Sequence, residues 1–288
     1  MTRPFLFTSL PPSMNRFDRD GRNIGYDYQR RCIASWIDCG FDVCSINAPQ
    51  EEIPQEFAKL VRVEKTERDA SEIAGKPLPY LQDMIGVIVR VTAGSGGFAL
   101  TNADILLSRE TVDISESVRT LRPQECIVEP RMDFAAMDKI SEGRLYPSGF
   151  DFFAFRAEDA RSLSLSRFVF GRPWWDYALP LSACFQGWRR KRIESPFAFH
   201  MLHDERWDLK SWRKFGDCFL DEIVLPRAGR MPPDRFFVRY ANEVAPQPLN
   251  SGFKTRTLKN IANILGFGRR QAMLGRLARL NIDALSRW

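Results

Sequence analysis

The sequence lacks the features of several common protein classes. No apolar run approaches the roughly 20 residues that cross a bilayer, so we expect no transmembrane segment. The N-terminal apolar stretch at residues 5–7 is short and is soon followed by Pro11-Pro12, which is a poor signal peptide. Histidine is scarce, with only His200 and His203 in 288 residues.

The six cysteines include no Cys-x-x-Cys pair. This absence argues against a zinc ribbon and against a thioredoxin-type redox site. Their neighbours are mostly apolar, which predicts buried thiols in a reducing compartment and hence a cytoplasmic protein.

Positive charge is concentrated at the C-terminus. The net charge of the chain is +6, yet residues 254–288 contain eight basic residues and a single aspartate. The rest of the chain is therefore close to neutral, and we expect no nucleic-acid partner. We divide the chain into a main domain, residues 1–225, and a C-terminal extension, residues 226–288.

Apolar residues recur in the extension at helical spacing, from Leu258 and Ile261 to Leu277 and Leu280. Basic amphipathic helices of this kind bind anionic membrane surfaces, which would place the protein at the inner face of the membrane. The alternative is that the apolar face packs on the main domain and the basic residues are solvated.

Strands and helices alternate in the first half of the main domain. The pattern predicts strands at residues 3–10, 41–48 and 61–63, and helices at 26–39 and 80–93. It also predicts a buried strand that begins at residue 97 and ends in the polar triplet 102–104, after which residues 105–107 are apolar again. Such alternation is typical of an α/β fold with a mostly parallel sheet flanked by helices. The second half is α+β, with strands at 149–155 and 196–202 and a helix that ends near residue 185.

The segment 97–107 carries a polar Asn102-Ala103-Asp104. A carboxylate at the carboxyl end of a buried strand lies where open α/β sheets bind ligands. Asp104 is therefore a candidate ligand of Mn²⁺ or Mg²⁺, with Asn102 contacting the ion or a sugar hydroxyl. The alternative is a loop carboxylate that caps the next turn.

In this order the segments resemble the GT-A-fold glycosyltransferases that use nucleotide-diphosphate sugars. The resemblance covers about residues 3–217. It depends on several short motifs in the expected order: residues 8–10, Ser35-Trp36, 43–47, Glu51-Glu52, 101–105, 151–155, 171–176 and 200–205. Asn102 departs from the pattern, because the family often has an aspartate there.

The resemblance implies a GT-A-like, Rossmann-like fold that binds a nucleotide-diphosphate sugar. The residues that it assigns to donor binding are Ser9, Asn47, Glu51, Lys76, Asn102, Asp104 and Trp175. Lys76 would place a positive charge near the phosphates, or it is simply a solvated loop lysine.

Two further assignments concern the metal and the catalytic base. A late histidine often completes the metal shell in this family, and His203 suits that role better than His200. Residues three apart on a strand face opposite sides, so the two histidines are not expected to bind one ion easily. The alternative for either is a buried or surface histidine that binds no metal.

Asp176 is the candidate base that takes a proton from the acceptor hydroxyl. The Trp174-Trp175 pair would form an apolar wall, on which a sugar ring stacks and which raises the carboxylate pKa. The alternative is that Asp176 caps a helix and both tryptophans lie in the core.

The sequence thus predicts a glycosyltransferase that moves a sugar from a nucleotide-diphosphate donor to a glycan or lipid-linked acceptor, as in bacterial glycan or glycolipid synthesis. The competing predictions are a non-catalytic GT-A-like protein that binds a nucleotide or glycan, and an adaptor at a membrane surface.

Overall fold

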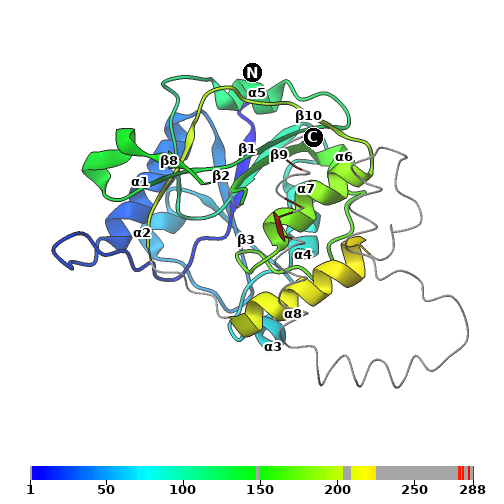
Figure 1. Ribbon diagram of the computed structural model, residues 1–288, viewed down its shortest axis with the longest axis horizontal. Helices are drawn as coiled ribbons and strands as arrows, with labels where there is room; N and C mark the ends of the chain where they lie inside the picture. The colour runs from blue at the N-terminus through cyan, green and yellow to red at the C-terminus, as the bar shows by residue number, and fades with distance from the viewer. Residues whose placement is uncertain are drawn as a thin grey trace, which may run out of the picture.

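The computed structural model describes residues 2–146, 149–203 and 209–224, and five residues near the C-terminus, Ala278, Arg279, Asn281, Leu285 and Trp288. Its core is a seven-stranded sheet in the order β10-β6-β9-β4-β1-β2-β3 (Figure 1). The bounds are β1 (Phe5–Thr8), β2 (Asp42–Asn47), β3 (Arg62–Lys65), β4 (Gly97–Thr101), β6 (Glu125–Glu129), β9 (Phe152–Arg156) and β10 (Arg189–Arg190).

This sheet is mostly parallel, as predicted. Strands β4, β1, β2 and β3 are parallel neighbours, and β9 pairs antiparallel with both β4 and β6. A second sheet has the order β5-β11-β7-β8, with bounds β5 (Ile105–Leu107), β7 (Met132–Phe134), β8 (Arg144–Leu145) and β11 (Ala198–Met201).

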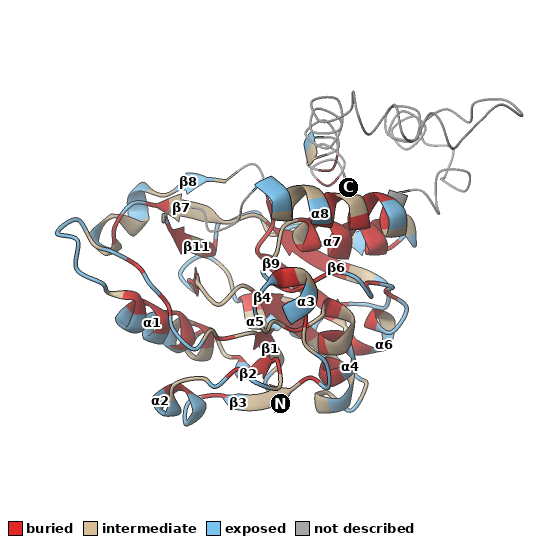
Figure 2. Cartoon of the chain, turned by 90° about the horizontal axis from the view of Figure 1, so that it is seen from below, coloured by how far each residue is buried: buried red, intermediate tan, exposed pale blue. Residues whose placement is uncertain are grey.

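Helices cover both faces of the large sheet. Figure 2 shows α4, α6, α7 and α8 on one side, and α1 with the second sheet on the other. The bounds are α1 (Gly25–Asp38), α2 (Gln55–Ala58), α3 (Ser71–Ala74), α4 (Leu81–Val91), α5 (Ile114–Arg119), α6 (Ala157–Ala160), α7 (Trp175–Phe185) and α8 (Leu209–Phe219), with a 3₁₀ segment η1 (Met137–Glu142) and a π-helical turn η2 (Leu220–Val224).

Each face of the sheet has its own apolar core, because successive strand residues point to opposite sides. In β1, Phe7 packs with α4 and α7, and the adjacent Leu6 packs with α1 and β5. All six cysteines lie in the described part of the chain, where they are buried and form no disulfide, as predicted.

The helices predicted at 26–39 and 80–93 are confirmed as α1 and α4, and the strands predicted at 3–10, 41–48 and 61–63 as β1, β2 and β3. The strand predicted to end at the polar triplet 102–104 is confirmed as β4, and the apolar residues after the triplet form a separate strand, β5. The chain leaves the large sheet after Thr101, turns through Asn102-Ala103-Asp104, and enters the second sheet as β5. Helix α1 holds β5 there: Trp36 Nε1 donates to Ile105 O at 2.7 Å, and Ser35 Oγ accepts from Leu107 N at 3.0 Å.

Most of the predicted C-terminal extension lies outside the described residues. Two of its described residues, Leu285 and Trp288, form hydrogen bonds with the main domain. Leu285 is fully buried, its carbonyl accepts from Arg190 Nη1 at 2.5 Å, and Trp288 Nε1 donates to Trp188 O at 2.9 Å. Among the described residues, no helix is both long enough and apolar enough to cross a membrane.

Candidate metal and nucleotide-sugar site

Asp104 lies in the turn that connects the two sheets, just beyond the carboxyl end of β4. Tyr28 of α1 fixes this turn, because its hydroxyl donates to Asp104 O and accepts from Met201 N, both at 2.9 Å. The Asp104 side chain is 23% exposed, so its carboxylate remains reachable from solvent.

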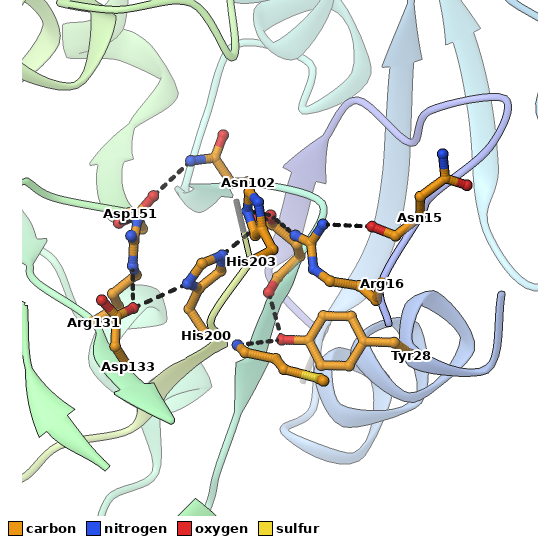
Figure 3. A network of polar contacts seen from close by, with 11 residues as sticks. Asn15, Arg16, Tyr28, Asn102, Arg131, Asp133, Asp151, His200 and His203 are labelled. Carbon is orange, nitrogen blue, oxygen red and sulfur yellow. Dashed lines mark hydrogen bonds and ion pairs between the residues drawn. The ribbon is translucent and has the colours of Figure 1, made fainter. Parts of the chain in front are cut away.

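Both histidines face this carboxylate. His200 Nε2 lies 3.4 Å from Asp104 Oδ2, and His203 Nε2 lies 3.7 Å from the same oxygen. The prediction that the two histidines cannot easily reach one ion is wrong. It applied the alternation of a strand to both residues, but β11 ends at Met201, so His203 lies beyond the strand and its direction is not set by that alternation. The two rings meet at a centroid distance of 5.1 Å (Figure 3).

These three side chains form a potential metal site. One ligand atom from each lies within 4.8 Å of the other two, the only such group found among the described residues. Two imidazoles and one carboxylate leave coordination positions open for substrate. Imidazole nitrogen binds divalent first-row transition metals, a series that includes Mn²⁺ and Zn²⁺, whereas Mg²⁺ favours an all-oxygen shell. The donor set therefore fits the Mn²⁺ alternative of the sequence prediction better than Mg²⁺.

His200 is oriented from its other side by Asp133. The two residues are register partners on the parallel strands β11 and β7, and His200 Nδ1 lies 2.9 Å from Asp133 Oδ1. Burial opposes protonation of His200, but the Asp104 carboxylate and the hydrogen bonds to both aspartates outweigh it and raise the pKa of His200. A carboxylate behind a ligating histidine fixes the ring and increases its basicity.

Asp104 carries a negative charge in this environment. Burial alone would raise its pKa, but His200, His203 and Arg16 outweigh that effect and hold the pKa of Asp104 well below its usual range. Arg16 forms an ion pair with Asp104 from the loop after β1, a residue that the sequence did not single out.

A chain of charged side chains leads away from the metal ligands (Figure 3). Arg131 lies 2.7 Å from Asp133 through Nε and 2.7 Å from Asp151 through Nη1, while its guanidinium covers the Tyr146 ring at 4.2 Å. Asp151 Oδ1 then accepts from Asn102 Nδ2 at 2.6 Å. Asn102 is thus held by Asp151.

Asp176 occupies the first turn of α7. Desolvation raises the pKa of Asp176 to about 7, and the Asp151 carboxylate adds to the rise. The backbone N–H groups of Asp176 and Tyr177 bind the carboxylate and oppose the shift. The side chain also comes close to Gly149, where an added Cβ would lie 3.2 Å from Asp176 Oδ2. Asp176 is therefore both a helix-capping group and a carboxylate poised to exchange protons near neutral pH.

The apolar wall predicted from Trp174-Trp175 does not face solvent. Trp175 is 3% exposed and packs against Phe153 and Phe170, with centroid distances of 5.1 and 4.6 Å. Trp174 is 2% exposed and packs against Trp212 of α8. Both tryptophans belong to the core, the alternative that the sequence left open, so Trp175 offers almost no surface on which a sugar could stack.

Three of the predicted donor-binding residues gather where β1 and β2 end. Asn47 joins the two strand ends, since its Nδ2 donates to Leu10 O at 2.7 Å and to Ser9 Oγ at 3.4 Å. Glu51 is 6% exposed and accepts from Ala48 N at 3.0 Å. Burial raises the pKa of Glu51, against the opposing effects of that hydrogen bond and of Lys76. Lys76, another of the predicted donor-binding residues, thus lies within electrostatic range of Glu51.

A cleft of about 380 Å³ lies beside the turn that carries Asp104. Tyr28 and Met201 form part of its lining, and the same two residues hold the Asp104 turn in place. The remaining lining comes from the loop after β1, from α1 and from η1.

Three residues of the site escaped the sequence analysis: Arg16, Arg131 and Asp133. Arg16 lies 88 residues from Asp104 in the chain, in a segment that the sequence indicates only as a polar loop. The pairing of Asp133 with His200 depends on the register of the second sheet, for which the sequence carries no signal.

Comparison with known proteins gives distant structural likenesses. No family model matches the chain, and no curated protein sequence matches it. A candidate nucleotide-diphospho-sugar transferase from Desulfovibrio desulfuricans G20 is similar over 96% of this chain and 99% of its own, at 9% identity and a TM-score of 0.41. GalNAc-T7 with UDP, GalNAc and Mn²⁺ is similar over 91% of this chain and 54% of its own, at 12% identity and a TM-score of 0.43.

The inositol-1-phosphate CTP transferase of T. maritima is similar over 76% of this chain and 96% of its own, at 10% identity and a TM-score of 0.40. Likenesses this distant do not assign an activity to the chain, so its chemistry has to be argued from its own residues.

Proposed function

We propose that the protein is a metal-dependent glycosyltransferase that moves a sugar from a nucleotide-diphosphate donor to a hydroxyl acceptor. One observation carries the proposal: Asp104, His200 and His203 converge where the parallel strands of an α/β sheet end. Ligands of open α/β sheets bind at this edge.

The donor would lie across the ends of β1, β2 and β4. Ser9 would contact the nucleoside, whereas the buried Asn47 and Glu51 would shape the strand ends beneath it. Lys76 would approach the phosphates. Asp104, His200 and His203 would hold Mn²⁺, which acts as a Lewis acid toward the diphosphate leaving group. Asp133 keeps the His200 ring oriented, and Arg131 holds Asp133 and Asp151 in place.

Asp176 would accept the proton of the acceptor hydroxyl. A pKa of about 7 suits a base that works near neutral pH, since it combines a substantial ionised fraction with adequate basicity. The neighbouring Asp151 helps to set that value.

A second candidate function is nucleotide or glycan binding without turnover. It is favoured by the backbone N–H groups that bind the Asp176 carboxylate, because they give this residue a structural task as a helix cap. Under this alternative the metal site would bind a nucleotide diphosphate, and Asp176 would not take part in chemistry.

Thermal-shift measurements with UDP and GDP, each with and without Mn²⁺, test the binding step. A ligand that binds only the folded protein raises its Tm. At a ligand concentration of 100 times Kd, the free energy of unfolding increases by about 2.7 kcal/mol. We expect a nucleotide-induced rise that requires Mn²⁺. If neither nucleotide raises the Tm in the presence of Mn²⁺, the proposal is wrong. Release of UDP or GDP from a panel of nucleotide sugars, with and without simple sugar acceptors, separates the enzyme from the binding protein.

A further inference from the structure

Arg16 contacts the oxygen that the metal would use. Its Nη2 pairs with Asp104 Oδ2, the atom that both His200 Nε2 and His203 Nε2 face. The Arg16 side chain is only 3% exposed, its Nη1 donates to Asn15 O at 3.1 Å, and its guanidinium lies 5.7 Å from the Tyr28 ring centre. These contacts hold one positive charge directly at the site (Figure 3).

This charge opposes binding of a free cation. Arg16 neutralises Asp104, the one carboxylate of the three potential metal ligands. Asp133 and Asp151 share Arg131 and so leave one negative charge nearby, but Asp133 contacts His200 at Nδ1, on the other side of the ring from Asp104. A divalent ion entering alone would therefore meet a buried guanidinium, and buried charge without a counter-ion is costly.

An anion removes this obstacle. Among the described residues the buried Arg16 Nε has no hydrogen-bond acceptor, so the protein itself does not satisfy every donor of the guanidinium. Guanidinium groups bind phosphate oxygens strongly, often through two donors at once. A diphosphate beside Arg16 would balance the charge of both the guanidinium and the metal.

We propose that Arg16 is an internal counter-ion of Asp104 that makes binding of the divalent cation and of the diphosphate mutually dependent. This inference rests on the proposed function and adds a statement about affinity. The cation and the diphosphate each bind weakly alone, and they bind strongly together. Because linkage is reciprocal, Mn²⁺ must improve diphosphate binding by the same factor by which the diphosphate improves Mn²⁺ binding.

Calorimetric titration of the full-length protein with Mn²⁺, with and without UDP, measures the coupling. The Mn²⁺–UDP complex that forms in solution is measured in a matched titration without protein and subtracted. For the wild type we expect UDP to strengthen Mn²⁺ binding by about tenfold or more, within the usual range of coupling between sites.

The Arg16→Met variant tests the residue itself. Without the guanidinium, Mn²⁺ alone should bind about tenfold more tightly than in the wild type, and UDP should add at most about twofold. Arg22→Met is the matched control: it removes an exposed arginine from the same loop and should behave as the wild type.

The outcomes are distinct. Wild-type protein that binds no Mn²⁺ with or without UDP overturns both the proposed function and this inference. Wild-type protein whose Mn²⁺ affinity is unchanged by UDP overturns the inference alone, whether or not Arg16→Met folds. Mn²⁺ binding by Arg16→Met with wild-type affinity and wild-type coupling also overturns it.

Discussion

Asp104 and Asp176 are the same residue type in opposite electrostatic environments. Asp104 faces two histidines and an arginine, which lower its pKa well below the usual range. Asp176 faces Asp151 at the edge of an aromatic core, and its pKa rises to about 7. When two carboxylates of one region have their pKa values pushed apart, their roles separate: one remains a charged ligand and the other can exchange protons.

Removal of Asp104, the charged carboxylate of the two, should have the largest effect. Asp104→Ala should abolish Mn²⁺-dependent UDP binding, because it deletes the only carboxylate among the three potential ligands. Calorimetry on the variant, with its fold checked by circular dichroism, gives the answer. Retention of wild-type UDP affinity in the presence of Mn²⁺ would remove Asp104 from the site.

The second prediction concerns the other carboxylate. Asp176→Asn should keep donor binding but lower the transfer rate by about 10²-fold or more, the usual scale for loss of a general base. In the wild type, kcat/KM should rise with pH through about 7 as Asp176 loses its proton, and the variant should lack this step. A variant that loses transfer and donor binding together would instead indicate a structural role.

The same shift predicts how stability depends on pH. The folded-state pKa of about 7 exceeds the ordinary value of 3.8, so the folded protein binds this proton more tightly than the unfolded chain. The contribution of Asp176 to stability is therefore fully present below the ordinary pKa and is lost as pH rises through about 7. Asp176→Asn should reduce the fall in Tm between about pH 5 and pH 8. An unchanged Tm profile would contradict the raised pKa.

A smaller effect on Mn²⁺ affinity is expected at Asp133, which contacts the potential ligand His200. Asp133→Asn weakens the hold on His200 without removing a ligand, and outer partners of this kind typically change metal affinity by about 10–100-fold. The change should appear as weaker Mn²⁺ binding in the presence of UDP. Asp138→Asn, which alters an exposed carboxylate of η1, is the matched control. If both variants bind Mn²⁺ equally well, Asp133 does not orient His200.

The smallest effect lies at the C-terminus. Trp288→Ala removes a hydrogen bond to Trp188 O and a contact with the core, at a cost of roughly 1–3 kcal/mol and therefore several degrees of Tm. Arg279→Ala alters an exposed residue of the same segment and should leave the Tm unchanged. An unaltered Tm in Trp288→Ala would show that this packing contributes nothing.

The same region is the one where we predicted membrane contact. Co-sedimentation with anionic and neutral liposomes separates the two roles: basic residues that bind a membrane should bring the full-length protein down with anionic liposomes only. If a version that ends before Lys254 sediments alike, the membrane prediction is wrong.

Part of the fold, and the position of Asp104, could be predicted from the sequence. Local periodicity was enough to place β1, β2, α1 and α4, and the polar triplet identified Asp104 at a strand end. The second sheet was not predicted, because the apolar residues on either side of the triplet are buried in both β4 and β5 and carry no sign of which sheet each strand joins.

The charged surroundings of the site depend on contacts between distant segments. Arg16, Asp133 and Arg131 reach the site through loop and strand placement, and no spacing in the chain encodes that placement. The direction of His203 could not be inferred from strand alternation, because β11 ends at Met201 and His203 lies beyond it. The prediction for Trp175 was wrong because the local sequence does not distinguish an aromatic pair in the core from one that lines a binding site.

The central claim is that both histidines and Asp104 hold one metal ion beside the nucleotide. Pulsed electron paramagnetic resonance of Mn²⁺ bound to the protein with UDP tests it directly, because nitrogen nuclei coordinated to Mn²⁺ give a characteristic coupling. The account predicts coupling from two imidazole nitrogens in the wild type, and from one in each of His200→Ala and His203→Ala. Bound Mn²⁺ without any nitrogen coupling would contradict the claim.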